Sequence, residues 1–92
     1  MDTYELHLAV QENPGSELGQ FQKHAEKDFP DAERARMIFE SQDVGFLLCS
    51  YDSDLREYTG KFAVAFRIVL DGVVVSEGQK NQMQYAAECV YE

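Results

Sequence analysis

The sequence predicts an α+β fold, in which about three helices pack on a four-stranded, mainly antiparallel sheet, with the elements in the order β-α-α-β-β-β-α. Three patterns indicate this fold. Apolar residues alternate near the N-terminus, an Asp-Gly pair divides two β-branched runs, and apolar residues in other segments recur at helical spacing. The 92 residues suffice for a single domain, 1–92, and leave nothing for a second core.

The first half of the chain is expected to form a strand and two helices. Apolar residues at every second position predict a strand over residues 4–10. Ser16, just after a turn signal, is placed to cap a helix that ends near Asp28, and residues 31–41 predict a second helix that follows Pro30. The residues expected on the apolar faces of these elements are Tyr4, Leu6, Leu8, Val10, Leu18, Phe21, Ala25, Phe29, Ala35, Ile38 and Phe39.

The second half is expected to form a strand, a hairpin and a last helix. Residues 44–51 are an apolar run that is too short for a helix and rich in strand-forming residues, which predicts a strand. The Asp-Gly pair at 71–72 predicts a hairpin of residues 62–70 and 73–75, because both turn positions favour positive φ. Helical spacing predicts a last helix from about Gln79 to the end. Its apolar stripe is expected at Met83, Ala86, Ala87, Val90 and Tyr91.

The chain is strongly acidic, with 17 Asp and Glu residues against 8 Lys and Arg residues and a net charge of −9. Such a charge repels nucleic acid and anionic lipid and favours basic protein surfaces, so neither free DNA nor a membrane is an expected partner. The first residues are acidic, whereas a secretory signal needs a basic start and an apolar run, so we expect a cytoplasmic protein. Cys49 and Cys89 are then expected to be buried thiols, in a strand and a helix, rather than a disulfide.

The sequence contains no arrangement that is expected to support catalysis, so we expect a protein that is not an enzyme and that needs no cofactor. A nucleophilic site would need Cys49 or Cys89 beside His7 or His24, held by a third polar group. Cys49 stands in the apolar run of residues 44–51, which indicates burial rather than activation.

A metal site is not expected either. Residues 52–54, Asp-Ser-Asp, resemble the start of a calcium-binding loop, but Arg56 occupies the position of a third oxygen ligand and Glu57 that of the required glycine. Asp and Ser are ordinary loop residues that bond local backbone amides, and that interpretation fits the segment better.

The acidic residues form either a solvating surface or a surface that binds a partner. Three features favour binding: the excess of acid is large for so short a chain, carboxylates crowd the junction between the first two predicted helices, and amide side chains are frequent on these helices. Carboxylates and amides on rigid helices can steer toward Lys and Arg of a partner and then hydrogen-bond with them. The expected partner-binding residues are Asn13, Gln20, Glu26, Asp28, Asp31, Glu33 and Arg34.

A short acidic chain with a strand, paired helices, a hairpin and a final helix is similar to the phage-encoded anti-CRISPR proteins, in particular those that inhibit type I-F systems. These inhibitors share no common motif, so the resemblance transfers no functional residue. It implies a protein in the host cytoplasm that docks on the RNA-guided Csy surveillance complex, whose Lys-rich backbone subunits line the path of target DNA. The implied effect is to block DNA capture or guide hybridisation. Arg34 and Arg36 could contact guide RNA in the complex or acidic residues of the partner.

Two other functions stay open. An acidic inhibitor of another basic nucleic-acid-binding enzyme, such as a restriction or toxin nuclease, would use the same charge. A small structural or assembly protein of a phage particle would instead self-associate through exposed apolar surface. The inhibitor is expected to be a monomer.

Overall fold

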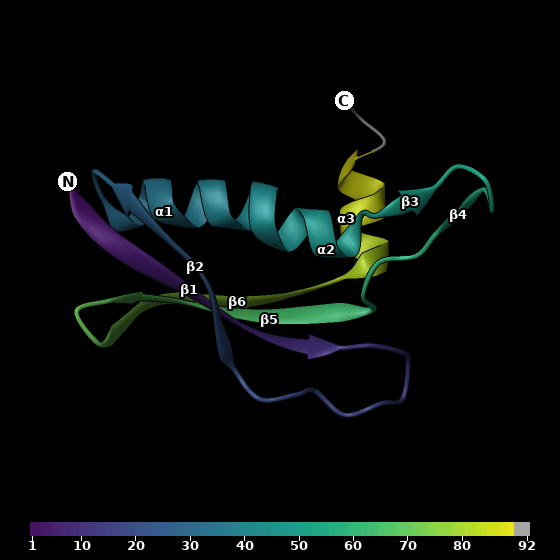
Figure 1. The fold of residues 1–92 in the computed structure, drawn as a ribbon, viewed down its shortest axis with the longest axis horizontal. Coiled ribbons are helices and arrows are strands. Elements are labelled where there is room, and N and C mark those ends of the chain that lie inside the picture. The colour runs from purple at the N-terminus through teal and green to yellow at the C-terminus, as the bar shows by residue number, and fades with distance from the viewer. Residues whose placement is uncertain (90–92) are drawn as a thin grey trace.

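The computed structural model describes residues 1–89 and contains a four-stranded antiparallel sheet packed with helices, which confirms the α+β fold class. Neighbouring strands in the sheet follow the order β2-β1-β5-β6 (Figure 1). Their bounds are Asp2–Gln11 for β1, Gln22–Phe29 for β2, Ala63–Leu70 for β5 and Val73–Asn81 for β6.

The helices lie on one face of this sheet (Figure 1). Three segments form one continuous helix, residues 32–48, because the residues at both junctions keep the right-handed helical conformation. The segments of this long helix are α1 (Ala32–Ile38), the π-helix η1 (Phe39–Val44) and α2 (Gly45–Leu48). The last helix, α3 (Gln82–Cys89), packs against the α2 end, where a small hairpin of β3 (Tyr51–Asp52) and β4 (Glu57–Tyr58) also projects.

The core lies between the sheet and the long helix. Its largest fully buried side chains are Leu6, Phe39, Val44, Leu48, Val64, Phe66 and Ile68. On the long helix the fully buried apolar side chains are those of Ala35, Phe39, Val44 and Leu48, which are spaced by four, five and four residues. The step of five falls within η1, where the wider π-helical turn takes up one extra residue. The inner face of the helix therefore stays aligned with the core along its whole length.

The loop of residues 12–21 covers part of the other face of the sheet (Figure 1). The Gly19 amide donates to the Val10 carbonyl at 3.0 Å, and the Phe21 ring lies 3.8 Å from the Arg67 guanidinium on β5. Ala9 and Ala65, which are opposite each other on this face, are buried. The loop thus excludes water from the middle of the sheet.

Local signals predicted three elements correctly. In β1, buried residues alternate with more exposed ones as expected. The helix after Pro30 starts with Asp31 as its N-cap, whose carboxylate accepts a hydrogen bond from the Arg34 amide at 2.8 Å. Asp71 and Gly72 both have positive φ, 51° and 79°, as the hairpin turn requires.

The predicted helix from Ser16 to about Asp28 is wrong. Residues 12–21 form the loop, and β2 follows it. β2 is a strand because it pairs along its length with β1, with Leu6 opposite Ala25, and this long-range pairing outweighs the local helical spacing. The predicted element order is corrected accordingly, since two strands precede the long helix.

A lysine interrupts the pattern of apolar residues at every second position of β2, so the sequence of this segment does not look like a strand. Ala25 is half-buried and Phe29 is buried, and Lys27 stands between them at the same period. Its ammonium lies 5.6 Å from the centroid of the Phe39 ring and 3.1 Å from a carboxylate oxygen of Asp43. A lysine stem can pack on apolar surface while its charge is neutralised, so an inward position of the strand holds a charged residue.

The predicted strand over residues 44–51 is also wrong, because the helix predicted for residues 31–41 continues through this segment to Leu48. Val44 and Leu48 extend the inner, buried face of the long helix. Cys49 is consequently the residue after α2, half-buried, and not part of a strand.

The last helix begins at Gln82 rather than near Gln79, because β6 runs on to Asn81. Asn81 and Gln84 form a reciprocal cap. The Asn81 side chain accepts from the Gln84 amide, and the Gln84 side chain accepts from the Asn81 amide, both at 2.9 Å. This cap fixes the point at which the strand becomes a helix.

The apolar stripe predicted for the last helix is also wrong where the structure describes it. Met83 is 76 % exposed, and the buried residue of α3 is Tyr85. Val90 and Tyr91, which were expected to extend the stripe, lie outside the described residues. None of the helices within residues 1–89 combines the length and apolar character needed to cross a bilayer.

Candidate partner-binding site

Most basic side chains are already paired with carboxylates. Within residues 1–89, six of the eight Lys and Arg residues form ion pairs. These pairs are Lys23–Glu26, Lys27–Asp43, Arg36–Glu40, Lys61–Glu12, Arg67–Glu77 and Lys80–Glu88. The net charge of −9 is therefore concentrated on the carboxylates outside these pairs.

Five such carboxylates gather at one end of the molecule, where β1 starts, β2 passes into α1, and β5 turns into β6 (Figure 1). We term this surface the acidic end, and its members are Asp2, Asp28, Asp31, Glu33 and Asp71. No member forms an ion pair with another residue of the described part of the chain. Arg34 is the basic residue that the chain places next to them.

The negative potential of the acidic end acts on a neighbouring tyrosine. Tyr4 is only 3 % exposed, and burial raises the pKa of its hydroxyl above the ordinary value. The carboxylates of Asp2 and Asp31 raise this pKa further, because they disfavour a third negative charge nearby. Two segments that are far apart in the sequence thus contribute to one field.

The structure brings together only part of the predicted binding surface. Asp28, Asp31, Glu33 and Arg34 belong to the acidic end or adjoin it. Glu26 lies further along β2, opposite Glu5, and pairs with Lys23 at 3.4 Å. The remaining two predicted residues lie in the loop of residues 12–21, beyond the far end of β1, and they are Asn13 and Gln20.

The expectation of amides on a rigid helix near the acid cluster is therefore wrong. The Asn13 carbonyl accepts from the Ser16 amide at 3.1 Å and from the Ser16 hydroxyl at 2.7 Å, so this residue shapes the turn of the loop. Sequence reasoning also missed Asp2 and Asp71. No linear cluster marks them, and only the antiparallel register of β1 with its neighbours could have indicated their position.

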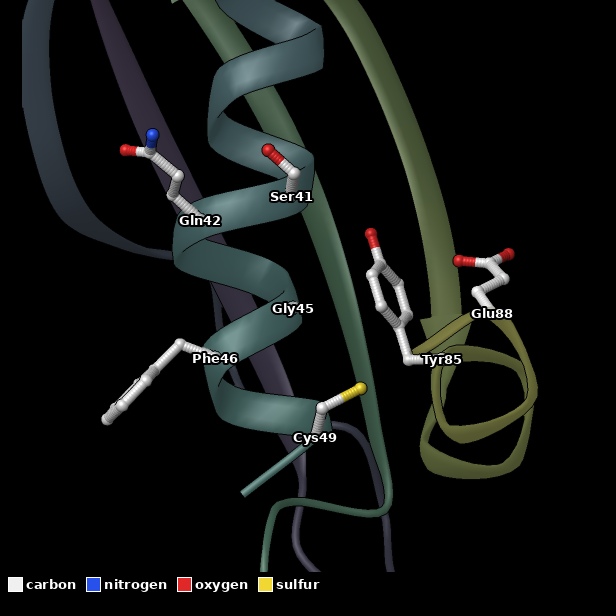
Figure 2. Close-up of a pocket in the computed structure, with 7 residues that line it drawn as sticks. All are labelled: Ser41, Gln42, Gly45, Phe46, Cys49, Tyr85 and Glu88. Atoms are coloured by element: carbon white, nitrogen blue, oxygen red, sulfur yellow. The ribbon is translucent and has the colours of Figure 1, made fainter. Parts of the chain in front are cut away.

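A second surface feature is a groove between the long helix and α3, formed by two adjoining hollows of about 430 and 390 Å³. Both hollows are lined by Ser41, Tyr85 and Glu88, and Met37 and Phe46 lie in one hollow each. We term this feature the helix groove. Figure 2 shows Ser41 and Gly45 on the long helix across from the Tyr85 ring of α3.

The floor of the helix groove is held in place by the π-helix. The Glu40 carbonyl accepts the Gly45 amide across the π-helical turn, and the Tyr85 hydroxyl donates to the same carbonyl at 2.8 Å. A side chain at Gly45 would meet the Tyr85 ring at 3.3 Å, so the glycine permits this close approach. The ring and the helix backbone thus form a fixed surface.

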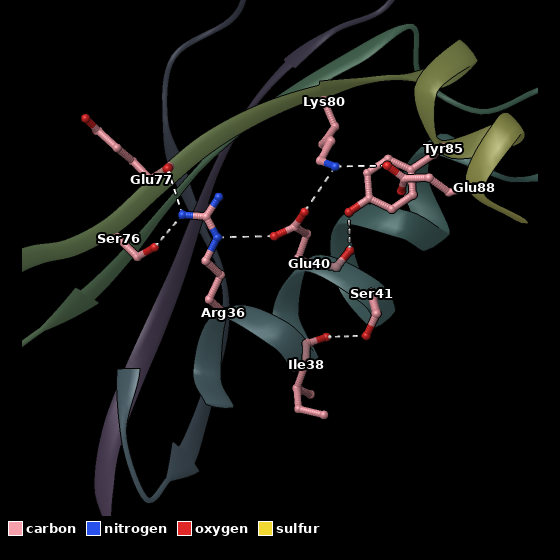
Figure 3. A network of polar contacts seen from close by, with 9 residues as sticks. All are labelled: Arg36, Ile38, Glu40, Ser41, Ser76, Glu77, Lys80, Tyr85 and Glu88. Carbon is pink, nitrogen blue, oxygen red and sulfur yellow. Dashed lines mark hydrogen bonds and ion pairs between the residues drawn. The ribbon is translucent and has the colours of Figure 1, made fainter. Parts of the chain in front are cut away.

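A charge network joins the groove to the sheet (Figure 3). The Glu40 carboxylate contacts Arg36 at 3.3 Å and Lys80 at 3.4 Å, and Lys80 also contacts Glu88 at 3.0 Å. Arg36 donates to the Ser76 hydroxyl on β6 at 2.9 Å. We term Arg36, Glu40, Lys80 and Glu88 the Lys80 network. The hydrogen bond to Glu88, followed by the contact with Glu40, raises the pKa of Lys80.

The candidates for catalysis considered in the sequence are dispersed among other contacts. His7 pairs with Glu5 at 2.8 Å, a hydrogen bond that lowers the pKa of the Glu5 carboxylate, and His24 lies 3.8 Å from Asp43. Cys49 lines the helix groove. Within residues 1–89, no group of three or more His, Cys, Asp or Glu side chains is arranged to hold a metal ion.

Comparison of the chain with protein-family models, with curated proteins and with solved structures found no match.

Proposed function

We propose that this protein is a non-enzymatic inhibitor that uses its acidic end to bind a basic, nucleic-acid-handling surface of the type I-F CRISPR (Csy) surveillance complex. The bound protein would block target DNA capture or guide hybridisation. The observation that carries the proposal concerns the described residues 1–89. Five carboxylates outside ion pairs gather at one end, while six of the eight basic residues are paired elsewhere. The choice of the Csy complex comes from the resemblance in size, charge and element pattern.

The physical basis is electrostatic. A channel that holds DNA or RNA displays Lys and Arg at spacings suited to phosphate groups. Carboxylates that form no ion pair with a described residue can pair with such side chains without first breaking a salt bridge in their own protein. Charge of this kind mainly raises the association rate and selects the partner, whereas slow dissociation needs a few well-packed anchoring contacts.

The two arginines beside the acidic cluster differ in availability. Arg36 is engaged by Glu40, Ser76 and the Glu77 carbonyl. Arg34 is exposed and contributes its backbone amide to the N-cap. Arg34 is therefore the residue that we propose to contact guide RNA or an acidic group of the complex.

The proposal is tested by binding of purified protein to purified Csy complex. Asp28→Ala together with Glu33→Ala removes two charges from the acidic end, and we expect affinity to fall about tenfold or more, with a smaller salt dependence. The matched control is Asp54→Ala with Glu57→Ala, which removes two exposed carboxylates near the β3–β4 hairpin. Equal loss in both double variants would show a non-specific effect of net charge, and unchanged affinity in the first would remove the acidic end from the interface.

A plasmid-interference assay tests the consequence in cells. In a host with an active type I-F system, expression of the wild-type gene should restore plasmid transformation, and the acidic-end double variant should restore it less. Wild-type protein that binds no Csy complex, but is recovered with a restriction or toxin nuclease from host lysate, would favour the alternative inhibitor function.

One observation favours the structural or assembly alternative. Val73, Val74 and Val75 are exposed on β6, which is an edge strand of the sheet. An exposed β-branched edge can pair with another chain. Light scattering at high concentration separates the two functions, because an inhibitor is expected to remain a monomer.

A further inference from the structure

We infer that the helix groove is a second binding site, which takes a large apolar side chain from a lysine- or arginine-rich protein segment. The inference rests on the proposed function for the identity of the partner, since it supplies the anchoring contact that charge alone does not. The groove itself can be tested with a peptide, independently of the Csy complex.

The size of the groove suits side chains of a partner. Its two hollows, of about 430 and 390 Å³, share the walls formed by Ser41, Tyr85 and Glu88. Binding sites for small ligands typically measure several hundred Å³. Each hollow can therefore hold one aromatic or large aliphatic side chain.

The floor is preorganised. Tyr85 is 6 % exposed, its hydroxyl is fixed on the Glu40 carbonyl at 2.8 Å, and Gly45 presents backbone without a side chain. A rigid floor loses little conformational entropy when a partner binds, which favours affinity.

The rim exposes large apolar side chains. Met37 is 58 % exposed and Phe46 is 74 % exposed, one beside each hollow. Methionine adapts to irregular apolar partners, and aromatic residues are frequent among the contacts that dominate binding energy. Between them, the hydroxyl of Ser41 and the amide of Gln42 provide polar groups at the rim.

Charge selects a basic occupant. Two carboxyl groups, those of Glu40 and Glu88, line the hollows, and no Lys or Arg among the described residues lines either one. Glu40 is already engaged by Arg36 and Lys80, so Glu88 is the carboxylate that a partner can reach. Glu88 is about half exposed, so a cation of a partner can reach it although Lys80 is 3.0 Å away. A second copy of this chain, also at −9, is repelled.

The groove is continuous with the acidic end. A smaller hollow of about 250 Å³ is lined by Asp31, Glu33, Arg34 and Met37, and Met37 also lines the groove. A single segment of a partner can therefore extend from the carboxylates at the start of α1 to Tyr85. In this arrangement the acidic end speeds association and the groove slows dissociation.

The test is an NMR titration with a synthetic amphipathic helical peptide that carries phenylalanine and leucine on one face and lysine on the other. We expect saturable shifts at Ser41, Gly45 and Tyr85. Two control peptides, one with serine in place of the apolar residues and one with glutamate in place of lysine, should bind about tenfold more weakly or worse. Shifts confined to the acidic end, or equal binding of the serine peptide, would overturn the inference.

Two variants locate the binding. Ser41→Trp fills the groove from an exposed position and should weaken binding of the amphipathic peptide about tenfold. Ser53→Trp is the matched control, because Ser53 is also an exposed serine but does not line the groove. With Csy complex, Ser41→Trp should speed dissociation and leave association unchanged. If the peptide does not bind in the groove but the wild-type protein binds the Csy complex, the groove inference alone is refuted. If the peptide binds in the groove but the wild-type protein does not bind the Csy complex, the proposed function alone is refuted.

Discussion

The acidic end and the Lys80 network use the same kinds of side chain for different purposes. In the Lys80 network, two carboxylates and two cations contact one another across three elements, the long helix, β6 and α3. At the acidic end, five carboxylates have no ion pair to any described residue, and two of them, Asp2 and Asp31, both raise the pKa of Tyr4. The ion pairs of the Lys80 network hold three elements together, whereas the carboxylates of the acidic end repel one another.

This difference teaches where function is to be sought. Charges that form ion pairs with one another contribute to stability, so removing one of them should lower the free energy of unfolding. Charges that repel one another reduce stability. Local roles account for Asp31, which caps the helix, and for Asp71, which forms the turn, but the gathering of five carboxylates at one end calls for another explanation, such as a partner that neutralises them. Removing a carboxylate from the Lys80 network should therefore lower the free energy of unfolding, and removing carboxylates from the acidic end should raise it.

The largest effect is expected in the Lys80 network, from Glu40→Ala. This change leaves Arg36 and Lys80 without a shared carboxylate that is only 23 % exposed. We expect the free energy of unfolding to fall by about 1–2 kcal/mol, measured by urea denaturation. Asp71→Asn is the control, since asparagine suits the same turn and the change should stay within about 0.5 kcal/mol. Similar losses in both variants would break the comparison.

The next effect concerns the link between the network and the π-helix. Tyr85→Phe removes the hydrogen bond to the Glu40 carbonyl and should cost about 1 kcal/mol at neutral pH. Burial, followed by the nearby carboxylates of Glu40 and Glu88, raises the pKa of Tyr85 above its ordinary value of 10.0. A raised pKa gives stability that is present below pH 10 and is lost as the pH rises further, because only the unfolded chain then ionises.

The alkaline titration separates the contribution of Tyr85 from that of Lys80. The raised pKa of Lys80 also gives stability that is lost at high pH, above its ordinary value of 10.5. Wild-type protein should lose stability from about pH 10, and Tyr85→Phe should lose it later and less steeply. Identical pH profiles would show that the hydroxyl ionises as readily in the folded chain as in the unfolded one.

Sequence reasoning succeeded where the signal was local. The turn at Asp71 and Gly72 and the start of the helix after Pro30 depend on residues next to each other, and both are confirmed. The prediction for β2 was wrong because pairing with β1 sets its conformation and because Lys27 interrupts its alternating apolar pattern. A pairing between distant segments leaves no mark in a short window of sequence.

The second half of the long helix was predicted wrongly, as a strand, for a different reason. The buried side chains of the long helix step by four, five and four, from Ala35 to Leu48, and the step of five fits a π-helical turn but not the α-helical repeat. A glycine within the helix, Gly45, adds a second misleading signal, because glycine is a poor helix former. The helix groove could not be foreseen for the same reason, since one of its walls was expected to be a strand.

The candidate site was foreseen in part. Asp28, Asp31 and Glu33 are close in the sequence and remain close in the structure. Asp2 and Asp71 join them through the antiparallel register of three strands. The acid excess was thus visible from composition, but its concentration at one end depends on tertiary structure.

A smaller effect is expected from neutralising the acidic end. Asp2→Asn together with Asp71→Asn should raise the free energy of unfolding by a few tenths of a kcal/mol at low salt, because mutual repulsion is reduced. High salt should remove this gain, since exposed charges are screened. Urea denaturation at two salt concentrations measures both changes. A loss of stability at low salt would show that these carboxylates have internal partners after all.

The smallest effect tests the shared field of the acidic end directly. Asp2→Asn with Asp31→Asn should lower the pKa of Tyr4, measured by NMR of its ring, while asparagine preserves the N-cap at position 31. The pKa should stay above its ordinary value, because burial is the larger cause. Asp54→Asn, near the β3–β4 hairpin, serves as the control and should leave it unchanged. If the pKa of Tyr4 does not change in this double variant, water screens each carboxylate separately. The acidic end would then act on a partner as isolated charges rather than as one field.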